Sequence, residues 1–370
     1  MKLPNSVYYV VLLLIIVAIA YKYASSTFAI KATAEYPVPV NKKKALTWII
    51  HMYPPYHNAG AEWMAHCLNR YLVAEQNYTI YVFIPSKSLL GIKYFDPTTI
   101  YEGVHVYDMH NTHALQHAIK HSAAICSHLD YSVEAHEIAG YAKKPYIHFA
   151  HNSFEMDKLR KWADGHSTYL VANSEWIKDF YSPLRLPTIT LYPPVFWKDY
   201  AIETPQPAQR KYITLVNLNE NKGGNILPQI AAALPQYDFA GVRGGYDAQI
   251  EKYQPNIKYF PNTPAIKTIY AQTRILLIPS KYESWGRVAV EAMSSGIPVI
   301  AHPTAGLREC LGGAGILCDR NDIASWTAAI KRLCEDPAYY ARISDSCSKR
   351  ARELDPIPQM NTFAEFVETL

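Results

Sequence analysis

The feature that most constrains the fold of this chain is a regular alternation of short apolar runs and helical patterns, which begins at residue 45. Runs that are apolar throughout are typical of strands buried on both faces of a parallel sheet, and the helical spacing between them predicts crossover helices. The sequence therefore predicts an α/β chain with doubly wound, mainly parallel sheets. In the first half, the expected strands are Ala45–Ile50, Thr79–Ile84, Ala123–Ser127, Tyr146–Ala150 and Thr168–Val171, and the expected helices are Ala61–Val73, Val133–Ala142 and Ser174–Phe180.

The alternation stops around Leu191–Gln206, where a cluster of prolines punctuates a stretch without any period. We interpret this stretch as a boundary between two Rossmann-like domains, and a length of 370 residues also suggests about two domains. A ligand is expected in the cleft between them, at the carboxyl ends of the strands. In the second half, the expected strands are Tyr212–Val216, Asp238–Val242, Ile257–Phe260, Ile275–Pro279 and Pro298–Ala301, and the expected helices are Ile226–Leu234, Asp247–Tyr253, Ala265–Gln272, Arg287–Ser294 and Ile323–Leu333.

Composition excludes several classes of protein. With 49% hydrophobic and 18% charged residues, the chain can bury a large core, which excludes intrinsic disorder. The net charge of +4 is too small and too dispersed for a protein that binds nucleic acid through its phosphates, so no nucleic-acid partner is expected. The six cysteines have neither zinc-ribbon spacing nor the density of a disulfide scaffold, and we expect them to be reduced and mostly buried.

The N-terminus differs from the rest of the chain. The run from Val7 to Ala20 has no charged residue. Extended by a few residues at either end, it would form a helix of about 28 Å, close to the thickness of a bilayer core. The pattern predicts a single-pass membrane anchor over residues 1–24, followed by a linker over residues 25–44. A cleaved signal peptide and a buried or interfacial helix are the alternatives, and similar positive charge on both sides leaves the orientation open.

The most informative stretch runs from Lys281 to Ala301 and reads KYESWGRVAVEAMSSGIPVIA. A helix opens near Arg287, so its free N–H groups can bind an anion, and Gly286 would allow a phosphate close to the backbone. Glu291 lies in this helix with apolar residues on nearly every side. A buried carboxylate without a partner costs several kcal/mol, so Glu291 needs a partner. We predict that Glu291 is left unpaired by the protein itself and is reserved for hydroxyl groups of a ligand. Pairing with an arginine elsewhere in the chain is the alternative.

Glu283 and Glu291 form an E-x7-E pair that lies between a strand ending in P-S and a strand reading P-V-I-A. This stretch resembles the signature of retaining glycosyltransferases of family 4, among the glycosyl transferases group 1. Members of that family have the GT-B fold, in which two Rossmann-like domains face a central cleft. The resemblance extends from about Ala45 to Ala351 and is clearest in the second half.

The resemblance implies roles for the residues of this motif. Glu291 would accept hydrogen bonds from the ribose of a nucleotide-sugar donor, and Glu283 would be a catalytic residue that binds hydroxyl groups of the transferred sugar. The sugar and the distal phosphate would be held, mainly through backbone N–H groups, by Ser284, Trp285, Gly286, Arg287 and Val288. For the indole of Trp285, plain packing is the alternative.

Lys222 lies in the stretch N-E-N-K-G-G and resembles the family lysine that neutralises the donor diphosphate. A cation there would be catalytic, because it stabilises the leaving group as negative charge develops. Five residues earlier the family usually has an arginine, where this chain has Asn217, which we still expect in the donor site. Arg243 is a candidate replacement for the missing arginine, and a surface position is its alternative.

Two positions in the first half resemble the rest of the donor site. Gly60 lies in a turn that resembles the family's G-G-A-E, with Ala59 in place of the first glycine, and would let the backbone approach the donor phosphate. His151 follows an expected strand, as the family's active-site histidine does, and would contact the donor sugar as a catalytic residue. A structural role is the alternative for His151, and it is the expected role of His148.

The base-binding region and the metal requirement follow from the same resemblance. Tyr259 and Phe260 lie at the end of an expected strand and would adjoin the nucleobase, with uracil and guanine both open. The chain contains no Asp-x-Asp, the motif with which metal-dependent glycosyltransferases hold their cation. We therefore expect no metal, and no cofactor besides the donor substrate.

Together these expectations predict a metal-independent retaining glycosyltransferase, which transfers a sugar from a UDP- or GDP-linked donor to a glycan, lipid or protein acceptor. An acceptor-side domain would span residues 45–200 and a donor domain residues 201–355, with a last helix over residues 356–370 packed back on the first domain. Both domains would lie at a membrane on the cytosolic side, where nucleotide sugars are made, and the secretory lumen is the alternative. The competing functions are a GT-B protein that binds nucleotide sugars without turnover and a nucleotide-sugar epimerase.

Overall fold

The computed structural model describes residues 44–55, 57, 59–85, 98–163, 165–202 and 210–370. The anchor predicted for residues 1–24, and all but the last residue of the linker predicted for residues 25–44, lie outside the described residues. None of the described helices combines the length and the apolar character that are needed to cross a bilayer. The membrane anchor therefore stays a prediction.

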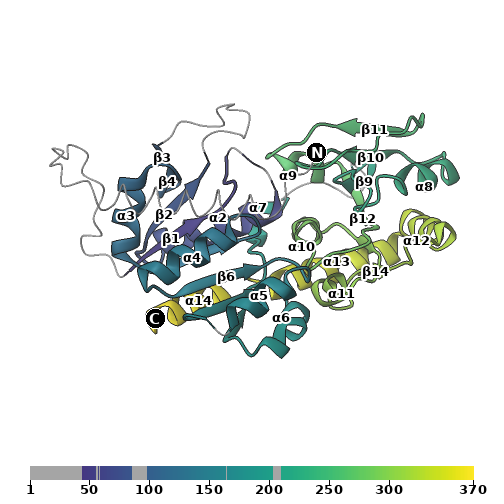
Figure 1. Ribbon diagram of the computed structural model, residues 1–370. Coiled ribbons are helices and arrows are strands. Elements are labelled where there is room, and N and C mark those ends of the chain that lie inside the picture. Colours follow the sequence, from purple (N-terminus) through teal and green to yellow (C-terminus); the bar gives the residue numbers. More distant parts are fainter. Residues whose placement is uncertain (1–43, 56, 58, 86–97, 164, 203–209) are drawn as a thin grey trace, which may run out of the picture. The chain divides into compact units, whose positions relative to one another are not determined.

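The first sheet has eight strands in the order β3-β4-β2-β1-β5-β6-β7-β8 (Figure 1). All neighbouring strands are parallel except β3, which pairs antiparallel with β4 at the edge. The central strands β1, β2 and β6 are buried along their whole length, as the uniform apolar runs predict. The strands are β1 (Ala45–Ile49), β2 (Thr79–Ile84), β3 (Thr98–Tyr101), β4 (Val104–Asp108), β5 (Ser122–His128), β6 (Tyr146–Ala150), β7 (Thr168–Ala172) and β8 (Thr188–Thr190). The helices that accompany them are α2 (Gly60–Ala74), α3 (Thr112–His121), α4 (Ser132–Ala142), α5 (Met156–Ala163) and α6 (Glu175–Tyr181), followed by the 3-10 helix η1 (Ser182–Leu184).

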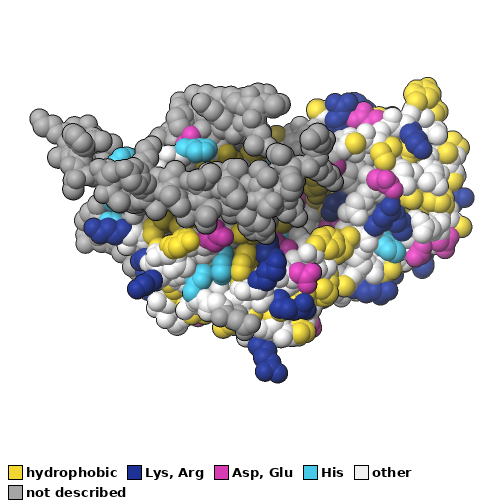
Figure 2. All heavy atoms as spheres, viewed as in Figure 1, with side chains coloured by type: hydrophobic (Ala, Val, Ile, Leu, Met, Phe, Trp, Pro, Cys, Tyr) yellow, Lys and Arg dark blue, Asp and Glu magenta, His cyan; other side chains and the backbone are white. Residues whose placement is uncertain are grey.

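Side-chain placement agrees with the composition. All six cysteines are free in the structure and five of them are buried, which confirms the expectation that they are mostly buried. On the face shown in Figure 2, Lys and Arg side chains are interspersed with Asp and Glu.

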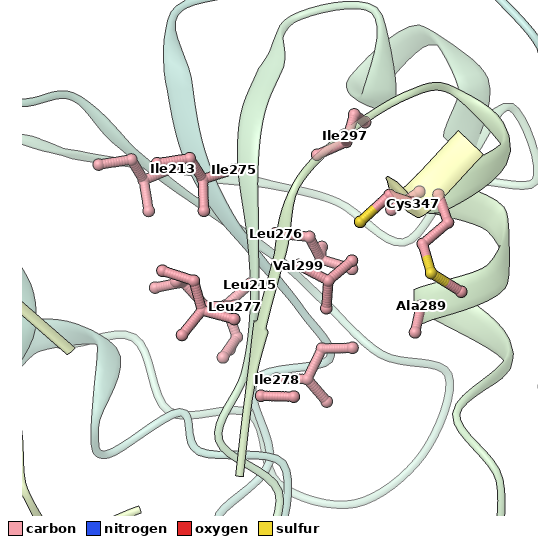
Figure 3. Packing of buried hydrophobic residues seen from close by; sticks show 14 of the residues in the cluster. Ile213, Leu215, Ile275, Leu276, Leu277, Ile278, Ala289, Ile297, Val299 and Cys347 are labelled. Atoms are coloured by element: carbon pink, nitrogen blue, oxygen red, sulfur yellow. The ribbon is translucent and has the colours of Figure 1, made fainter. Parts of the chain in front are cut away.

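The second sheet has six strands, all parallel, in the order β11-β10-β9-β12-β13-β14. Side chains of β9, β12 and β13 pack together with Ala289 of helix α10 and Cys347 of helix α13 (Figure 3). The strands are β9 (Tyr212–Val216), β10 (Phe239–Val242), β11 (Ile257–Phe260), β12 (Thr273–Ile278), β13 (Val299–Ala301) and β14 (Ile316–Leu317). The remaining helices are α7 (Trp197–Tyr200), α8 (Leu227–Ala233), α9 (Ile266–Tyr270), α10 (Arg287–Ser294), α11 (Ala305–Leu311), α12 (Ile323–Glu335), α13 (Pro337–Glu353) and α14 (Ile357–Glu368).

The helix predicted over Asp247–Tyr253 is wrong, because this segment is a loop. Asp247 has φ 61°, in the left-handed region, which interrupts a right-handed helix. The side-chain oxygen of Gln249 accepts hydrogen bonds from the backbone N–H groups of Leu218 and Gly244, which ties the loop to the end of β9. Tyr253 is 88% exposed, so the segment has no buried apolar face that would favour a helix.

Helix α14, the last element of the chain, packs into the core of the first sheet (Figure 1). Its Phe363 is fully buried and its ring centroid lies 5.7 Å from that of Phe149 in β6. The Tyr78 hydroxyl donates to the Glu368 carboxylate over 2.7 Å, and Lys44 Nζ donates to the Val367 carbonyl over 2.9 Å. The chain therefore returns to its first domain after completing the second.

Replacing Phe363 with alanine tests this crossover. We expect the free energy of unfolding to fall by about 3–5 kcal/mol, because the substitution opens a cavity in a core that α14 helps to fill. Urea unfolding would measure the change. Glu365→Ala, an exposed substitution on the same helix, should stay within about 0.5 kcal/mol of the wild type. Equal effects of the two substitutions would show that α14 does not stabilise the first domain.

Candidate active site

Two adjoining cavities, of about 260 Å³ and about 550 Å³, lie where the two sheets present the carboxyl ends of their strands. We call them the smaller and the larger cavity. Both are lined by Lys222, Glu283 and Arg287 from the second domain and by Gly60 from the first. The sequence motifs of the two halves therefore meet at one place.

Lys222 and Glu283 form an ion pair at the centre of this region. The distance from Lys222 Nζ to Glu283 Oε1 is 2.5 Å, and the Ser280 hydroxyl donates to the same oxygen over 2.9 Å. Burial lowers the pKa of Lys222, but the Glu283 carboxylate and Tyr246 outweigh that effect and the pKa lies above its ordinary value. Lys222 is therefore a protonated cation at neutral pH.

The turn that carries Lys222 fits its place only with glycines. Gly223 has φ 99°, and a Cβ there would clash with the ring of Pro279, just beyond β12. A Cβ on Gly224 would clash with the carbonyl of Leu218. The Asn219 side chain accepts a hydrogen bond from the backbone N–H of Lys222 over 2.8 Å. The stretch N-E-N-K-G-G thus packs a tight turn against β12 and directs Lys222 toward Glu283.

Glu291 is paired, so the prediction of an unpaired carboxylate is wrong. Its Oε1 accepts from Arg287 Nε over 2.8 Å, and its Oε2 accepts from the Tyr270 hydroxyl over 2.9 Å. The arginine partner that stood as the alternative lies on the same helix, four residues earlier, at a spacing that favours ion pairs. Glu291 still lines the smaller cavity, and each carboxylate oxygen can accept a second hydrogen bond.

The segment after Glu283 is held from several sides. Trp285 is buried and stacks on Tyr192, with ring centroids 3.9 Å apart and an interplanar angle of 17°. The Ser284 hydroxyl accepts from the Asn173 side chain over 2.8 Å, and the Ser284 carbonyl accepts from the indole N–H of Trp176 over 2.7 Å. Sequence analysis missed Asn173 and Trp176, because neither belongs to a motif of the second half. Both lie just after β7, at the carboxyl edge where site residues gather.

Gly286 begins the helix of the motif. It has φ 120°, and a Cβ there would clash with the side chain of Leu307. No side chain caps the N-terminus of α10 at this position. Ser284, Trp285 and Gly286 line the larger cavity, and Val288 lines the smaller one.

A cluster of histidines and one carboxylate forms the first-domain wall of the larger cavity. Glu62, at the start of α2, is 2% exposed, and its Oε1 lies 2.9 Å from His51 Nε2 and 3.5 Å from His57 Nδ1. Burial raises the pKa of Glu62, but the hydrogen bonds from His51 and His57 outweigh burial and hold the pKa well below its usual range. Sequence analysis gave Glu62 no role, although it directly follows the turn at Gly60.

His151 also lines the larger cavity. Its Nε2 lies 2.9 Å from His128 Nδ1, so one imidazole donates to the other. Burial is the main cause that lowers the pKa of His151 to about 4, and His151 is therefore neutral at neutral pH. His148 lies outside both cavities, fully buried, where it bonds Glu155 and Tyr146.

Three other residues that the sequence analysis considered for the donor site, Tyr259, Phe260 and Arg243, lie outside the cavities or at their edge. Tyr259 and Phe260 line neither cavity: the Tyr259 hydroxyl donates to the Lys252 carbonyl, and the Phe260 ring lies below Lys258. The neighbouring residues Asn262, Thr263 and Pro264 line the smaller cavity instead. Arg243 reaches the edge of the smaller cavity, but its side chain is 53% exposed and pairs with Glu251.

Asn217 lines the smaller cavity at the end of β9. Its backbone lies in the left-handed region, with φ 70°, and its side-chain oxygen accepts a hydrogen bond from the backbone N–H of Asn219.

Within the described part of the chain, no group of three or more His, Cys, Asp and Glu side chains is arranged to hold a metal ion.

Comparisons with known proteins agree with this arrangement. Residues 205–353 match the family model described as glycosyl transferases group 1. A D-inositol 3-phosphate glycosyltransferase of Corynebacterium kroppenstedtii is 40% identical over 86 residues, which cover 22% of this chain and 19% of the relative. The O-antigen chain mannosyltransferase B of Escherichia coli is 37% identical over 71 residues, 19% of each chain. This chain thus aligns with about a fifth of the length of these curated relatives.

Similar solved structures cover nearly the whole chain. Sucrose-phosphate synthase from Thermosynechococcus elongatus has a TM-score of 0.68 at 14% identity, covering 86% of this chain and 96% of that chain. Anabaena HepE in complex with UDP and glucose has a TM-score of 0.69 at 17% identity, covering 88% and 99%. The fold is therefore GT-B-like, with two Rossmann-like domains, and the match to the glycosyl transferases group 1 model lies in the second of them.

The hydrogen bonds between the Glu62 carboxylate and the histidines His51 and His57 contribute to the stability of the fold in a pH-dependent way. Glu62→Gln should lower the free energy of unfolding by about 1–3 kcal/mol near neutral pH, because it removes a buried charge-assisted hydrogen bond. The folded-state pKa of Glu62 is below the unfolded value, so this contribution is present above the ordinary carboxyl pKa and is lost as pH falls through the folded-state pKa.

Urea unfolding of both proteins from neutral to acidic pH would measure this effect. The difference between them should shrink on the acid side, whereas Glu137→Gln, an exposed substitution, should leave stability unchanged at every pH. A difference that does not change with pH would contradict the ion pairing of Glu62.

Proposed function

We propose that this chain is a metal-independent retaining glycosyltransferase of family 4, which transfers a hexose or related sugar from a nucleotide-diphosphate sugar. The observation that carries the proposal is the meeting of Lys222, Glu283 and Glu291 on two adjoining cavities beside the start of α10. One cation, one carboxylate beside it and a second carboxylate on the helix match the three parts of such a donor: diphosphate, sugar and ribose.

The donor would lie across both cavities. The ribose would bond Glu291 in the smaller cavity, and the diphosphate would accept hydrogen bonds from backbone N–H groups near Gly286, at the uncapped start of α10. Lys222 would neutralise the diphosphate, and the transferred sugar would reach Glu283 in the larger cavity. The UDP complexes of HepE support a nucleotide donor of this kind, as a likeness of fold.

The reaction then needs little covalent chemistry from the protein. An acceptor oxygen attacks the anomeric carbon on the face from which the diphosphate leaves, and the bond between that carbon and the phosphate oxygen breaks. The acceptor proton passes to the departing phosphate oxygen, so atoms and charge balance and the configuration is retained. Lys222 stabilises the negative charge that develops on the leaving group. Among the side chains of the site, it makes the largest contribution to lowering the activation barrier in this mechanism.

The acceptor would enter from the side of the first domain, past His151. The larger cavity holds about 550 Å³ and is bounded there by His51, His57 and His151. The imidazole of His151 is neutral and can act as donor and acceptor toward a hydroxyl group, so a glycan, lipid-linked or protein-linked hydroxyl acceptor fits the proposal. Membrane attachment through residues 1–24, with the catalytic domains on the cytosolic side, is part of the same proposal.

Donor binding can be tested by thermal stabilisation with uridine, guanosine and adenosine diphosphate sugars. At a ligand concentration of 100 times the dissociation constant, one of them should stabilise the fold by about 2.7 kcal/mol. Glu291→Gln should weaken that donor by roughly 10- to 100-fold, because it removes charge-assisted hydrogen bonds to the ribose. Glu335→Gln, in the same domain, where the carboxylate accepts from the Tyr237 hydroxyl and lines neither cavity, is the matched control. A folded protein that none of the donors stabilises would exclude the proposal.

Turnover is tested at Lys222. Lys222→Met should lower kcat by roughly 10²- to 10³-fold, because it removes the cation that stabilises the leaving group. Lys281→Met removes an exposed lysine nearby, which pairs with Glu220, and should leave kcat unchanged. Kinetics with the donor found above and NMR assignment of the product anomer would measure both rate and retention. Donor binding without transfer would favour the non-catalytic alternative, and an epimerised sugar nucleotide formed without acceptor would favour the epimerase.

A further inference from the structure

Arg320 is a buried arginine that lies outside both cavities but directly behind the loops that form them. It follows β14 in the chain and is 5% exposed. Its Nη2 donates to the Glu220 carbonyl over 2.7 Å and to the Asn225 side-chain oxygen over 3.0 Å. Its Nη1 donates to the Asn221 carbonyl over 3.2 Å and also to the Pro279 carbonyl. One guanidinium therefore binds four oxygens.

These four oxygens belong to the two segments that carry the central ion pair. Glu220, Asn221 and Asn225 flank Lys222 in its turn, and Pro279 immediately precedes the segment that leads to Glu283. The backbone N–H of Lys281 also donates to the Asn221 carbonyl over 2.8 Å. Arg320 thus fastens the end of β12 to the turn after β9.

The charge of Arg320 is not neutralised by an acid. Among the described residues, no carboxylate oxygen lies within ion-pair distance of its guanidinium, and Glu220, whose carbonyl accepts from Arg320, pairs its carboxylate with Lys281 instead. A buried cation that is solvated only by neutral oxygens is costly to the folded state. An apolar side chain of similar volume could fill the space but could not donate to the four oxygens, so the guanidinium is needed for the contacts between these two segments.

We propose that Arg320 is a positioning residue for the reaction, which holds Lys222 and Glu283 in register and adds an unneutralised positive charge behind the site of the leaving diphosphate. This inference rests on the proposed function, and it assigns a role to a side chain that touches no substrate. The planar guanidinium is needed because a lysine at this position has one nitrogen and cannot span both segments.

The test compares Arg320→Lys with Arg210→Lys. Arg210 is an equally buried arginine of the same domain, 6% exposed, and it donates to the Ser295 and Gly296 carbonyls, which line neither cavity. Arg320→Lys should lower kcat by between about 10- and 100-fold, because a displacement of about 1 Å at a catalytic group has an effect of that size. The donor KM should change much less, and Arg210→Lys should leave both constants near the wild type.

A double-mutant cycle separates positioning from general destabilisation. In a chain that already carries Lys222→Met, adding Arg320→Lys should lower kcat by no more than about twofold, because the pairing of Lys222 with Glu283 that Arg320 aligns is already lost. Full additivity of the two substitutions would overturn the proposal, and so would an Arg320→Lys protein with wild-type kcat.

Amide hydrogen exchange provides a measurement that does not depend on turnover. In the Arg320→Lys protein, exchange should accelerate in residues 219–225 and 279–283 and stay unchanged elsewhere in the second domain. Faster exchange throughout the domain would show a purely structural role and overturn the proposal. If the wild type transfers no sugar, the proposed function fails, while the exchange pattern still decides whether Arg320 holds these two loops.

Discussion

The ion pair between Lys222 and Glu283 determines where two loops from separate strands meet, and the site depends on that meeting. Each side chain is largely buried, 20% and 11% exposed, and either charge alone would carry a large desolvation penalty. As an ion pair, the two side chains together carry no net charge until an anion binds beside them. Under the proposed function, a diphosphate competes for the lysine, and this frees the Glu283 oxygens for the hydroxyls of the donor sugar.

The loop that contains Glu283 is shaped by both domains, although its motif lies in one. Asn173 and Trp176, from the segment after β7, donate to the hydroxyl and carbonyl of Ser284. The backbone N–H of Ser153 donates to the Tyr282 hydroxyl over 2.9 Å. Since each of these bonds crosses from the first domain to the second, the geometry around Glu283 depends on how the domains are held together. The return of α14 to the first core contributes to that hold.

Sequence reasoning predicted the parts of the fold that follow from local pattern. The buried strands β1, β2 and β6 and the helix α10 were predictable because apolar runs and the E-x7-E spacing are properties of neighbouring residues. The edge strands β3 and β8 were missed because short, half-exposed segments have no such pattern. The error at Asp247–Tyr253 has a related cause, since Gln249 forms its hydrogen bonds with residues distant in the chain.

Prediction of the site had the same limit. Lys222, Glu283 and Gly60 were identified from motifs, and the structure brings all three to adjoining cavities. The side chains that support them come from elsewhere: Asn173 from the other domain and Arg320 from about 100 residues further along the chain. No local spacing signals such partners, because their contacts exist only after the chain has folded.

Arg287 shows why pairing does not exclude Glu291 from ligand binding. Its guanidinium donates to Glu291, to the Pro194 carbonyl over 2.8 Å and to the Tyr200 hydroxyl over 3.1 Å. Pro194 and Tyr200 belong to the stretch between the two sheets, so this stretch and the carboxylate share one cation. A movement that broke those bonds would leave buried donors unsatisfied, which is costly. Glu291 is therefore held in one orientation before any ligand binds, so under the proposed function a ribose that bonds it need not order it first.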